Sequence, residues 1–200
     1  MPGGQAWCEA QFWLGQITLE SGDLPTSFGH FTAICDAIAG RGPSRVPALG
    51  LGGRSVTLAN LGRVPEALDQ ARRSLAMAGE LSYPDGQALA LMDLAIATGY
   101  AGDPGGAVRF ARQAGRIPGL RGWLARMSDY LLTAMLIQAG DTAAAEPVCV
   151  AALARAPDAG DQWNLAVLPR LMADLATRCA RPGRCSQRTR PARPGNAERR

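Results

Sequence analysis

The apolar positions along this chain recur with helical spacing. Leu89, Met92 and Ile96 follow one another at intervals of three and four residues, and Ala67, Ala71 and Leu75 recur at intervals of four. Such spacing gathers apolar side chains on one face of an α-helix. We find no sustained alternation of apolar and polar residues of the kind that marks a strand. The pattern therefore predicts an all-α protein.

An internal repeat of about 40 residues orders these helical segments. Each copy contains a glycine, at Gly22, Gly62, Gly102 and Gly140. A small residue stands five positions after each glycine, at Ser27, Ala67, Ala107 and Ala145. Another stands seven positions before it, at Gly15, Ser55, Ala95 and Thr133. Because three columns stay in register, we predict that each copy is one structural unit.

Each copy is interpreted as a hairpin of two helices. The glycine ends the first helix in the left-handed conformation, and the small residues let the two helices approach closely. Aspartates cap three of the second helices, at Asp23, Asp103 and Asp141. Prolines stand in the first turn of second helices, at Pro25, Pro65 and Pro104. Helix-breaking residues separate the copies, at 40–43, Tyr83–Pro84 and Pro118–Gly119.

These columns resemble the tetratricopeptide repeat (TPR). The matching positions are Gly15, Gly22, Ala95, Gly102, Ala107, Gly140, Ala145 and Pro157. The resemblance covers residues 5–157, and Trp123 and Trp163, 40 residues apart, indicate a fifth first helix at 161–177. For residues 1–177 it implies a right-handed superhelical solenoid of about four TPR-like hairpins plus a final helix. The period is longer than the usual 34 residues, so longer helices or linkers are expected.

Long, alanine- and arginine-rich repeats of this kind are similar to the C-terminal repeat arms of large bacterial LuxR-type regulators that contain an ATPase domain. Residues 61–76 are typical of such arms. In that family the arm senses an inducer or a partner, while separate domains bind ATP and DNA. The resemblance implies a protein-interaction or ligand-sensing module linked to transcriptional regulation, as a detached or truncated regulator arm.

Charge divides the chain into two parts. The net charge is +4, but residues 178–200 contain eight arginines and one glutamate, which leaves residues 1–177 mildly acidic. We expect 178–200 to be a disordered Arg/Pro-rich tail. An alternative function follows, in which the protein is a nucleic-acid-associated accessory protein that binds non-specifically through this tail.

The chain lacks recognisable catalytic and metal-binding motifs. It contains no lysine, which excludes a standard P-loop, and we interpret Gly50–Gly53 as a repeat linker or helix start. The single histidine, His30, is expected to be a packing or surface residue. Five cysteines without a signal sequence do not suggest a disulfide framework, and Cys8, Cys35 and Cys149 are expected to act as small apolar residues. We predict no enzyme activity, no metal and no cofactor.

Two carboxylates, Asp93 and Asp129, lie within otherwise apolar first helices. A buried pair of carboxylates can act as acid and base. The favoured alternative is that each forms an ion pair with a neighbouring helix, for which Arg54 and Arg126 are available.

The TPR resemblance also implies a concave face lined by fixed first-helix positions. Transferred column by column, these form three rows: Phe12, Gly52, Met92 and Tyr130; Gln16, Val56, Ile96 and Ala134; and Glu20, Asn60, Tyr100 and Gln138. From them we predict partner-binding residues, namely Phe12, Gln16, Asn60, Met92, Ile96, Tyr100, Tyr130 and Gln138. The mixture suits an extended peptide or a small apolar ligand. Met92 and Ile96 fit equally well as core residues.

Neither end of the array has the polar surface that caps a solenoid. The first helix contains Trp7, Phe12, Trp13 and Leu14, and the last contains Trp163, Leu165, Leu168, Leu171 and Leu175. We therefore expect self-association through these end helices, or a place within a longer array. Without a signal sequence or an apolar run long enough to span a bilayer, we expect a cytoplasmic protein with no membrane contact.

Overall fold

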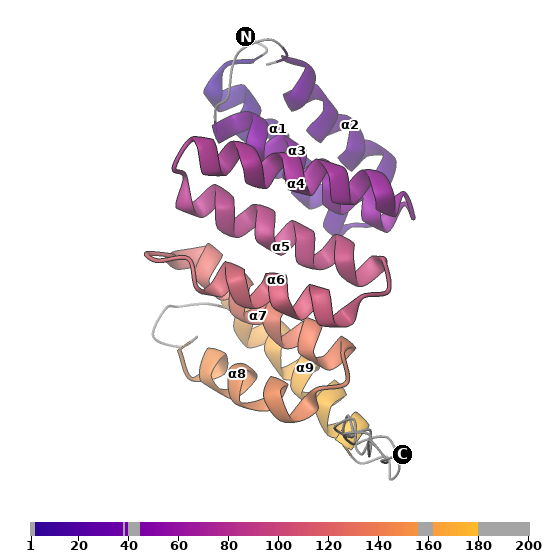
Figure 1. The fold of residues 1–200 in the computed structure, drawn as a ribbon, viewed down its shortest axis with the longest axis vertical. Coiled ribbons are helices and arrows are strands. Elements are labelled where there is room, and N and C mark those ends of the chain that lie inside the picture. The colour runs from indigo at the N-terminus through magenta and orange to yellow at the C-terminus, as the bar shows by residue number, and fades with distance from the viewer. Residues whose placement is uncertain (1–2, 38, 40–44, 156–161, 180–200) are drawn as a thin grey trace, which may run out of the picture.

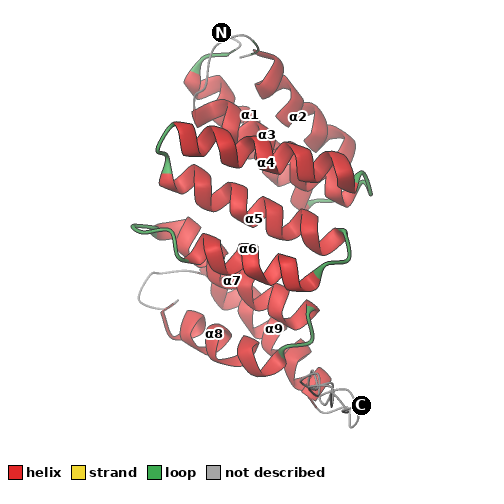
Figure 2. Cartoon of the chain, viewed as in Figure 1, coloured by secondary structure: helices red, strands yellow, loops and turns green. Residues whose placement is uncertain are grey.

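The computed structural model describes residues 3–37, 39, 45–155 and 162–179, which form a stack of helices (Figure 1). In these residues the helices are α1 (Gln5–Glu20), α2 (Leu24–Ala37), α3 (Arg45–Asn60), α4 (Val64–Glu80), α5 (Pro84–Tyr100), α6 (Pro104–Gly115), α7 (Gly122–Gln138), α8 (Thr142–Arg155) and α9 (Gln162–Cys179). The described part of the chain contains helices and loops but no strand (Figure 2). The all-α prediction is confirmed, and α9 is the fifth first helix expected at 161–177.

The helices pair as the repeat predicts. Helices α1 and α2, α3 and α4, α5 and α6, and α7 and α8 form four hairpins, and α9 packs against α7 and α8. The hairpins follow one another along the long axis of the molecule (Figure 1). Each first helix also packs against the next one in the series, from α1 through α3, α5 and α7 to α9. This arrangement is a helical solenoid of TPR-like hairpins.

The turn inside each hairpin has the predicted geometry. The four glycines that end the first helices have positive φ angles: Gly22 83°, Gly62 77°, Gly102 80° and Gly140 77°. After Gly102, the amide of Asp103 donates to the carbonyl of Thr98 at 3.2 Å, which is the Schellman hydrogen bond. The Asp103 carboxylate then accepts from the amide of Gly106 at 2.7 Å and caps α6.

The two columns of small residues meet where the paired helices cross. Gly15 is buried, and Ser27, Ser55, Ala67, Ala95, Ala107, Thr133 and Ala145 are completely buried. The Ser27 hydroxyl donates to the carbonyl of Gly15 at 2.9 Å, and the Ser55 hydroxyl donates to the carbonyl of Ala67 at 2.8 Å. Small side chains therefore allow each hairpin to close onto backbone atoms.

The glycine-rich stretch Gly50–Gly53 lies inside α3, so it is neither a linker nor the loop of a phosphate site. Its glycines are explained by close packing. A Cβ atom at Gly53 would overlap the Phe31 ring, and one at Gly50 would come within 2.9 Å of Ile34. A Cβ atom at Gly52 would overlap the carboxylate of Asp93. Neighbouring helices approach this turn of α3 more closely than any side chain would permit.

The largest apolar cluster lies in the middle of the stack, between α5, α6, α7 and α8. Its buried members are Ala88, Leu91, Met92, Ala95, Ala107, Val108, Ala111, Ala114, Leu131, Met135, Leu136, Ile137 and Ala145. Two of the predicted breaks, Tyr83–Pro84 and Pro118–Gly119, separate helices as expected. The break at 40–43 and residues 180–200, which make up most of the predicted tail, lie outside the described residues.

Candidate groove on the first-helix face

The first helices of all four hairpins contribute to one apolar pocket of about 230 Å³. Its walls come from α1, α2, α3, α5 and α7 and from the loop before α5. The lining residues are Cys8, Glu9, Phe12, Trp13, Ile34, Val46, Leu49, Tyr83, Leu89, Trp123 and Leu124. A concave, largely apolar cavity of this kind suits the burial of an apolar ligand group.

Aromatic residues join distant repeats across this pocket. The rings of Trp13 on α1 and Trp123 on α7 meet edge to face, with centroids 6.3 Å apart. Phe12 packs edge to face against Trp13 at 5.4 Å and against the buried Phe31 at 6.0 Å. The aromatic pair therefore links the first hairpin to the fourth, and Phe12 connects the groove to the core of the first hairpin.

A smaller cavity of about 20 Å³ adjoins the apolar pocket. Phe12, Leu49 and Leu89 line both spaces, so the two lie side by side, and we refer to them together as the groove. The smaller cavity adds polar groups, which come from Gln16, Ser74 and Asp93, to walls formed by Ala48, Gly53 and Gly86. Its size is sufficient for about one water molecule or a small polar group.

Asp93 has no hydrogen-bond or ion-pair partner among the described residues. Burial of the carboxyl group, which disfavours its charged form, raises the pKa of Asp93 from 3.8 to about 7. The expected partner, Arg54, instead places its guanidinium over the ring of Phe28 at 5.4 Å, and its Nε has no hydrogen-bond partner. The ion-pair interpretation is therefore wrong for Asp93.

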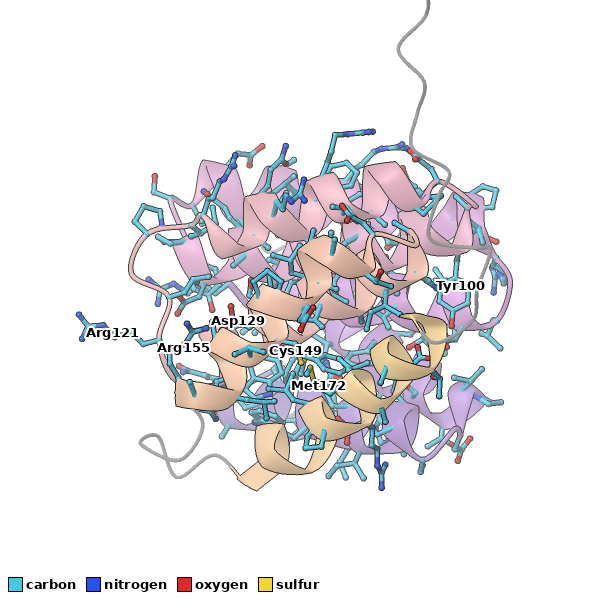
Figure 3. The ribbon with its side chains drawn as sticks, turned by 90° about the horizontal axis from the view of Figure 1, so that it is seen from below. Tyr100, Arg121, Asp129, Cys149, Arg155 and Met172 are labelled. Atoms are coloured by element: carbon cyan, nitrogen blue, oxygen red, sulfur yellow. The ribbon has the colours of Figure 1, made fainter. Side chains whose placement is uncertain are left out.

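Asp129 does form an ion pair, although with a different partner from those expected. Its carboxylate contacts the guanidinium of Arg155 on α8, and the two side chains lie next to each other in Figure 3. The Arg155 side chain is 62% exposed and that of Asp129 is 32% exposed. Asp129 is paired with Arg155 and Asp93 lies in the groove, and the interactions of the described residues include no contact between the two carboxylates.

The third predicted row lies at the exposed ends of the first helices. Asn60, Tyr100 and Gln138 are all exposed, and the Tyr100 hydroxyl donates to the Asn60 side-chain oxygen at 2.7 Å. A Cβ atom at Gly99 would lie 3.2 Å from the side-chain oxygen of Gln138. The structure therefore brings Asn60 and Tyr100 into contact and places the Gln138 side chain beside Gly99 of α5.

The second row lies partly in the groove. Gln16 lines the smaller cavity, whereas Ile96 is partly buried and packs against the main core cluster. Ile96 therefore contributes to the packing of the core as well as to the surface, which agrees with its interpretation as a core residue.

The first row divides between groove and core. Phe12 lines both cavities, but Met92 is only 3% exposed and belongs to the main core cluster. Tyr130 packs against the buried Cys149 and Leu168 of α8 and α9. Met92 is therefore a core residue, and Tyr130 joins α7 to the helices that follow it.

Sequence reasoning missed most residues that line the groove, including Trp13, Leu49, Leu89, Trp123 and Leu124. Trp13 and Asp93 lie nine residues before their turn glycine, and Leu49 and Leu89 lie thirteen before theirs. The first predicted row lies ten residues before the glycine, and one residue rotates a side chain by about 100° around a helix. Helical spacing counted back from Asn60 and Gln16 could have found the correct columns.

The other residues singled out in the sequence have structural surroundings. His30 lies 2.7 Å from the side-chain oxygen of Gln11, which joins α2 to α1. Cys8 and Cys149 are buried, and burial raises the pKa of the Cys149 thiol. Among the described residues, no three His, Cys, Asp or Glu side chains lie close enough together to hold a metal ion. Within the same residues, no helix has the length and apolar character needed to cross a bilayer.

Comparison with solved structures identifies the same architecture in another protein. The chain is similar to the nearly identical TPR-like repeats of a kinesin light chain-like protein from Podosopora anserina, with a TM-score of 0.57 and 17% sequence identity. The similarity covers 86% of this chain and 94% of the other, and a variant of that protein matches equally well. No family model matches this sequence. No curated protein matches it either. The likeness establishes the TPR-like fold.

Proposed function

We propose that this chain is a protein-interaction module that binds an extended, largely apolar peptide segment in the groove. The observation that carries the proposal is the apolar pocket of about 230 Å³ lined by four successive first helices. TPR-like solenoids are built to present an extended concave surface to a partner. The exposed Asn60, Tyr100 and Gln138 supply hydrogen-bonding groups on the same helices.

The groove can be tested with one variant inside it and one outside. Leu89→Glu places a charge at a position shared by both cavities, whereas Val150→Glu places the same charge on α8, where the valine is 50% exposed. We expect partners crosslinked to the wild-type protein in cells to be retained by Val150→Glu and lost with Leu89→Glu. Equal retention by two folded variants would contradict binding in the groove.

We further propose that the module is linked to transcriptional regulation, as a detached or truncated regulator arm acting in the cytoplasm. The support is the likeness of residues 61–76 to the repeat arms of LuxR-type regulators. Such an arm acts by binding rather than by catalysis, so we propose that the chain is not an enzyme. If deletion of the chain leaves the expression of a reporter gene under the regulated promoter unchanged, this result contradicts the link to transcription.

Self-association through the N-terminal end of the stack is a second proposal about partners. Leu14 is 44% exposed and Ile17 is 61% exposed, both on α1. The residues at the same repeat positions in α5, Leu94 and Ala97, are at most 2% exposed because α5 has the preceding hairpin beside it. We propose that a second copy of the chain covers the equivalent face of α1.

The alternative function rests on the basic tail. Residues 180–200 lie outside the described residues, so its support is the eight arginines between 178 and 200. If the tail binds nucleic acid, deletion of residues 178–200 abolishes salt-dependent binding to a mixed-sequence duplex DNA. In that case the groove variant Leu89→Glu retains binding.

A further inference from the structure

The carboxyl group of Asp93 is the unusual polar group of the groove. It projects from the middle of α5 toward α3, and it has neither a hydrogen bond nor an ion pair among the described residues. Buried polar groups in folded proteins are almost always hydrogen-bonded, since an unpaired group retains its desolvation penalty. An unpaired carboxyl at the wall of a groove therefore requires an explanation.

The chain makes room for this group. A Cβ atom at Gly52 would overlap the carboxylate. Asp93 can therefore occupy its position because Gly52 of α3 has no side chain. The small cavity in front of it is bounded by Gln16 of α1 and Ser74 of α4. The Ser74 hydroxyl already donates to the carbonyl of Ala48 at 2.8 Å, so its proton is not available to Asp93.

The charge of the groove is negative. Among the described residues that line its two cavities, Asp93 and Glu9 are acidic and none is an arginine. Next to Asp93, the walls are apolar through Phe12, Leu49 and Leu89. A ligand group that complements this surface has an apolar body and a positive charge.

We propose that the groove binds a peptide segment in which an arginine or lysine is flanked by apolar residues, with its cation paired to Asp93. The apolar flanks occupy the 230 Å³ pocket. The aliphatic stem of the basic side chain packs along the walls that the two cavities share. Because the Asp93 side chain is partly buried before binding, forming the pair removes less water than a pair formed from a fully exposed carboxylate.

This inference rests on the proposed function, and it names the chemistry of the partner. The two aspartates inside first helices, Asp93 and Asp129, differ in how their charge is satisfied. Asp129 is satisfied within the chain by Arg155, whereas Asp93 lines a cavity and has no partner among the described residues. Aromatic rings at Trp13 and Trp123 border the same groove and favour a nearby cation through their π faces.

The test uses acetylated and amidated apolar hexapeptides with one central arginine, each also made with citrulline and with glutamate. Citrulline keeps the shape of arginine but removes its charge. We expect fluorescence polarisation at pH 8 to give at least tenfold tighter binding for arginine than for citrulline with the wild-type chain. Asp93→Asn removes this preference, while Asp129→Asn and Glu9→Gln retain it.

The outcomes separate this inference from the proposed function. Equal binding of arginine and citrulline peptides would overturn the role of Asp93 and leave peptide binding in the groove intact. If no peptide of the set binds, both proposals fail. A preference removed by Glu9→Gln but not by Asp93→Asn would place the cation elsewhere and also overturn the inference. Cooperative thermal unfolding of each variant confirms that it is folded.

Discussion

The hydroxyl of Tyr100 donates a 2.7 Å hydrogen bond to the side-chain oxygen of Asn60. The two residues are 40 positions apart and occupy the same place in successive repeats, at the ends of α5 and α3. Both are exposed, so water competes for the same donor and acceptor. The bond therefore fixes the direction of two groups at the C-terminal ends of α3 and α5 more than it stabilises the fold.

Removing this hydrogen bond should have a small effect on stability. We expect Tyr100→Phe to lower the free energy of unfolding by less than about 1 kcal/mol in urea denaturation. If the row contributes to peptide binding, the same variant weakens binding, and combining it with Asn60→Ala weakens binding no further. Independent, additive losses in the double-mutant cycle would show that the two groups act separately.

The stability of the chain should be sensitive to substitution of Gly53, although this residue lies in a glycine-rich stretch of the sequence. Gly53→Ala inserts a methyl group against the ring of Phe31, which is fully buried and packs against Phe12. Overpacking of this type costs about 1–3 kcal/mol. We expect a lower melting temperature and, because Phe12 lines the groove, a change in the fluorescence of the neighbouring Trp13.

A matched control for Gly53 lies one helix earlier. Gly29 is inside α2, and a Cβ atom there would meet no atom within 4 Å. Gly29→Ala should stabilise the chain by up to about 1 kcal/mol, because alanine favours helix over glycine. Two variants with the same chemical change then have opposite signs. Destabilisation by both would show that packing around Gly53 is not the cause.

Asp93 should make stability depend on pH. Its pKa is about 7 in the folded chain against an ordinary value of 3.8, so the folded state retains a proton that the unfolded state has lost. Stability from this group is present below pH 4 and is lost as the pH rises to about 7, by at most about 4 kcal/mol. Asp93→Asn should remove this loss and leave the variant more stable than wild type at pH 8.

The measurement is the difference in unfolding free energy between wild type and Asp93→Asn across pH 4 to 8. The difference isolates Asp93 from other carboxylates, such as Asp23 and Glu66, whose pKa values are lowered by hydrogen bonds. Asp129→Asn serves as the control, because its pair with Arg155 is largely exposed and contributes less than about 1 kcal/mol. A constant difference between wild type and Asp93→Asn would contradict burial of the carboxyl.

The repeat turns could be predicted from the sequence because they depend on local geometry. The glycine before Asp103 must adopt a positive φ, and the small residues seven before and five after it must fit a helix crossing. These requirements leave a signature at fixed spacing. The hairpin pairing follows from that signature. The all-α fold follows from it together with the absence of alternating apolar and polar residues, and the fifth first helix follows from the 40-residue spacing of Trp123 and Trp163.

The groove could not be placed as accurately, because its position depends on how each helix rotates in the stack. A shift of one residue separates the buried Met92 from Asp93, which lines the groove. The sequence could not predict that Asp129 pairs with Arg155 on α8 or that Asp93 has no partner among the described residues. Both outcomes depend on distances between helices. The interpretation of Gly50–Gly53 as a repeat linker or helix start missed this close packing, because sequence spacing does not reveal that the Asp93 carboxylate lies against Gly52.

The exposed face of α1 gives the final prediction. Ile17 is 61% exposed at the repeat position that Thr57 and Ala97 occupy with complete burial. In the second repeat, the preceding helix covers this position, where the hydroxyls of Ser27 and Thr57 lie 3.1 Å apart. A second copy that covers α1 removes apolar surface from water in the same way.

We expect sedimentation velocity to show a concentration-dependent dimer for wild type and a monomer for Ile17→Asp. Val150→Asp, which adds the same charge to an exposed valine on α8, should still dimerise. A wild-type monomer at every concentration would overturn self-association through α1.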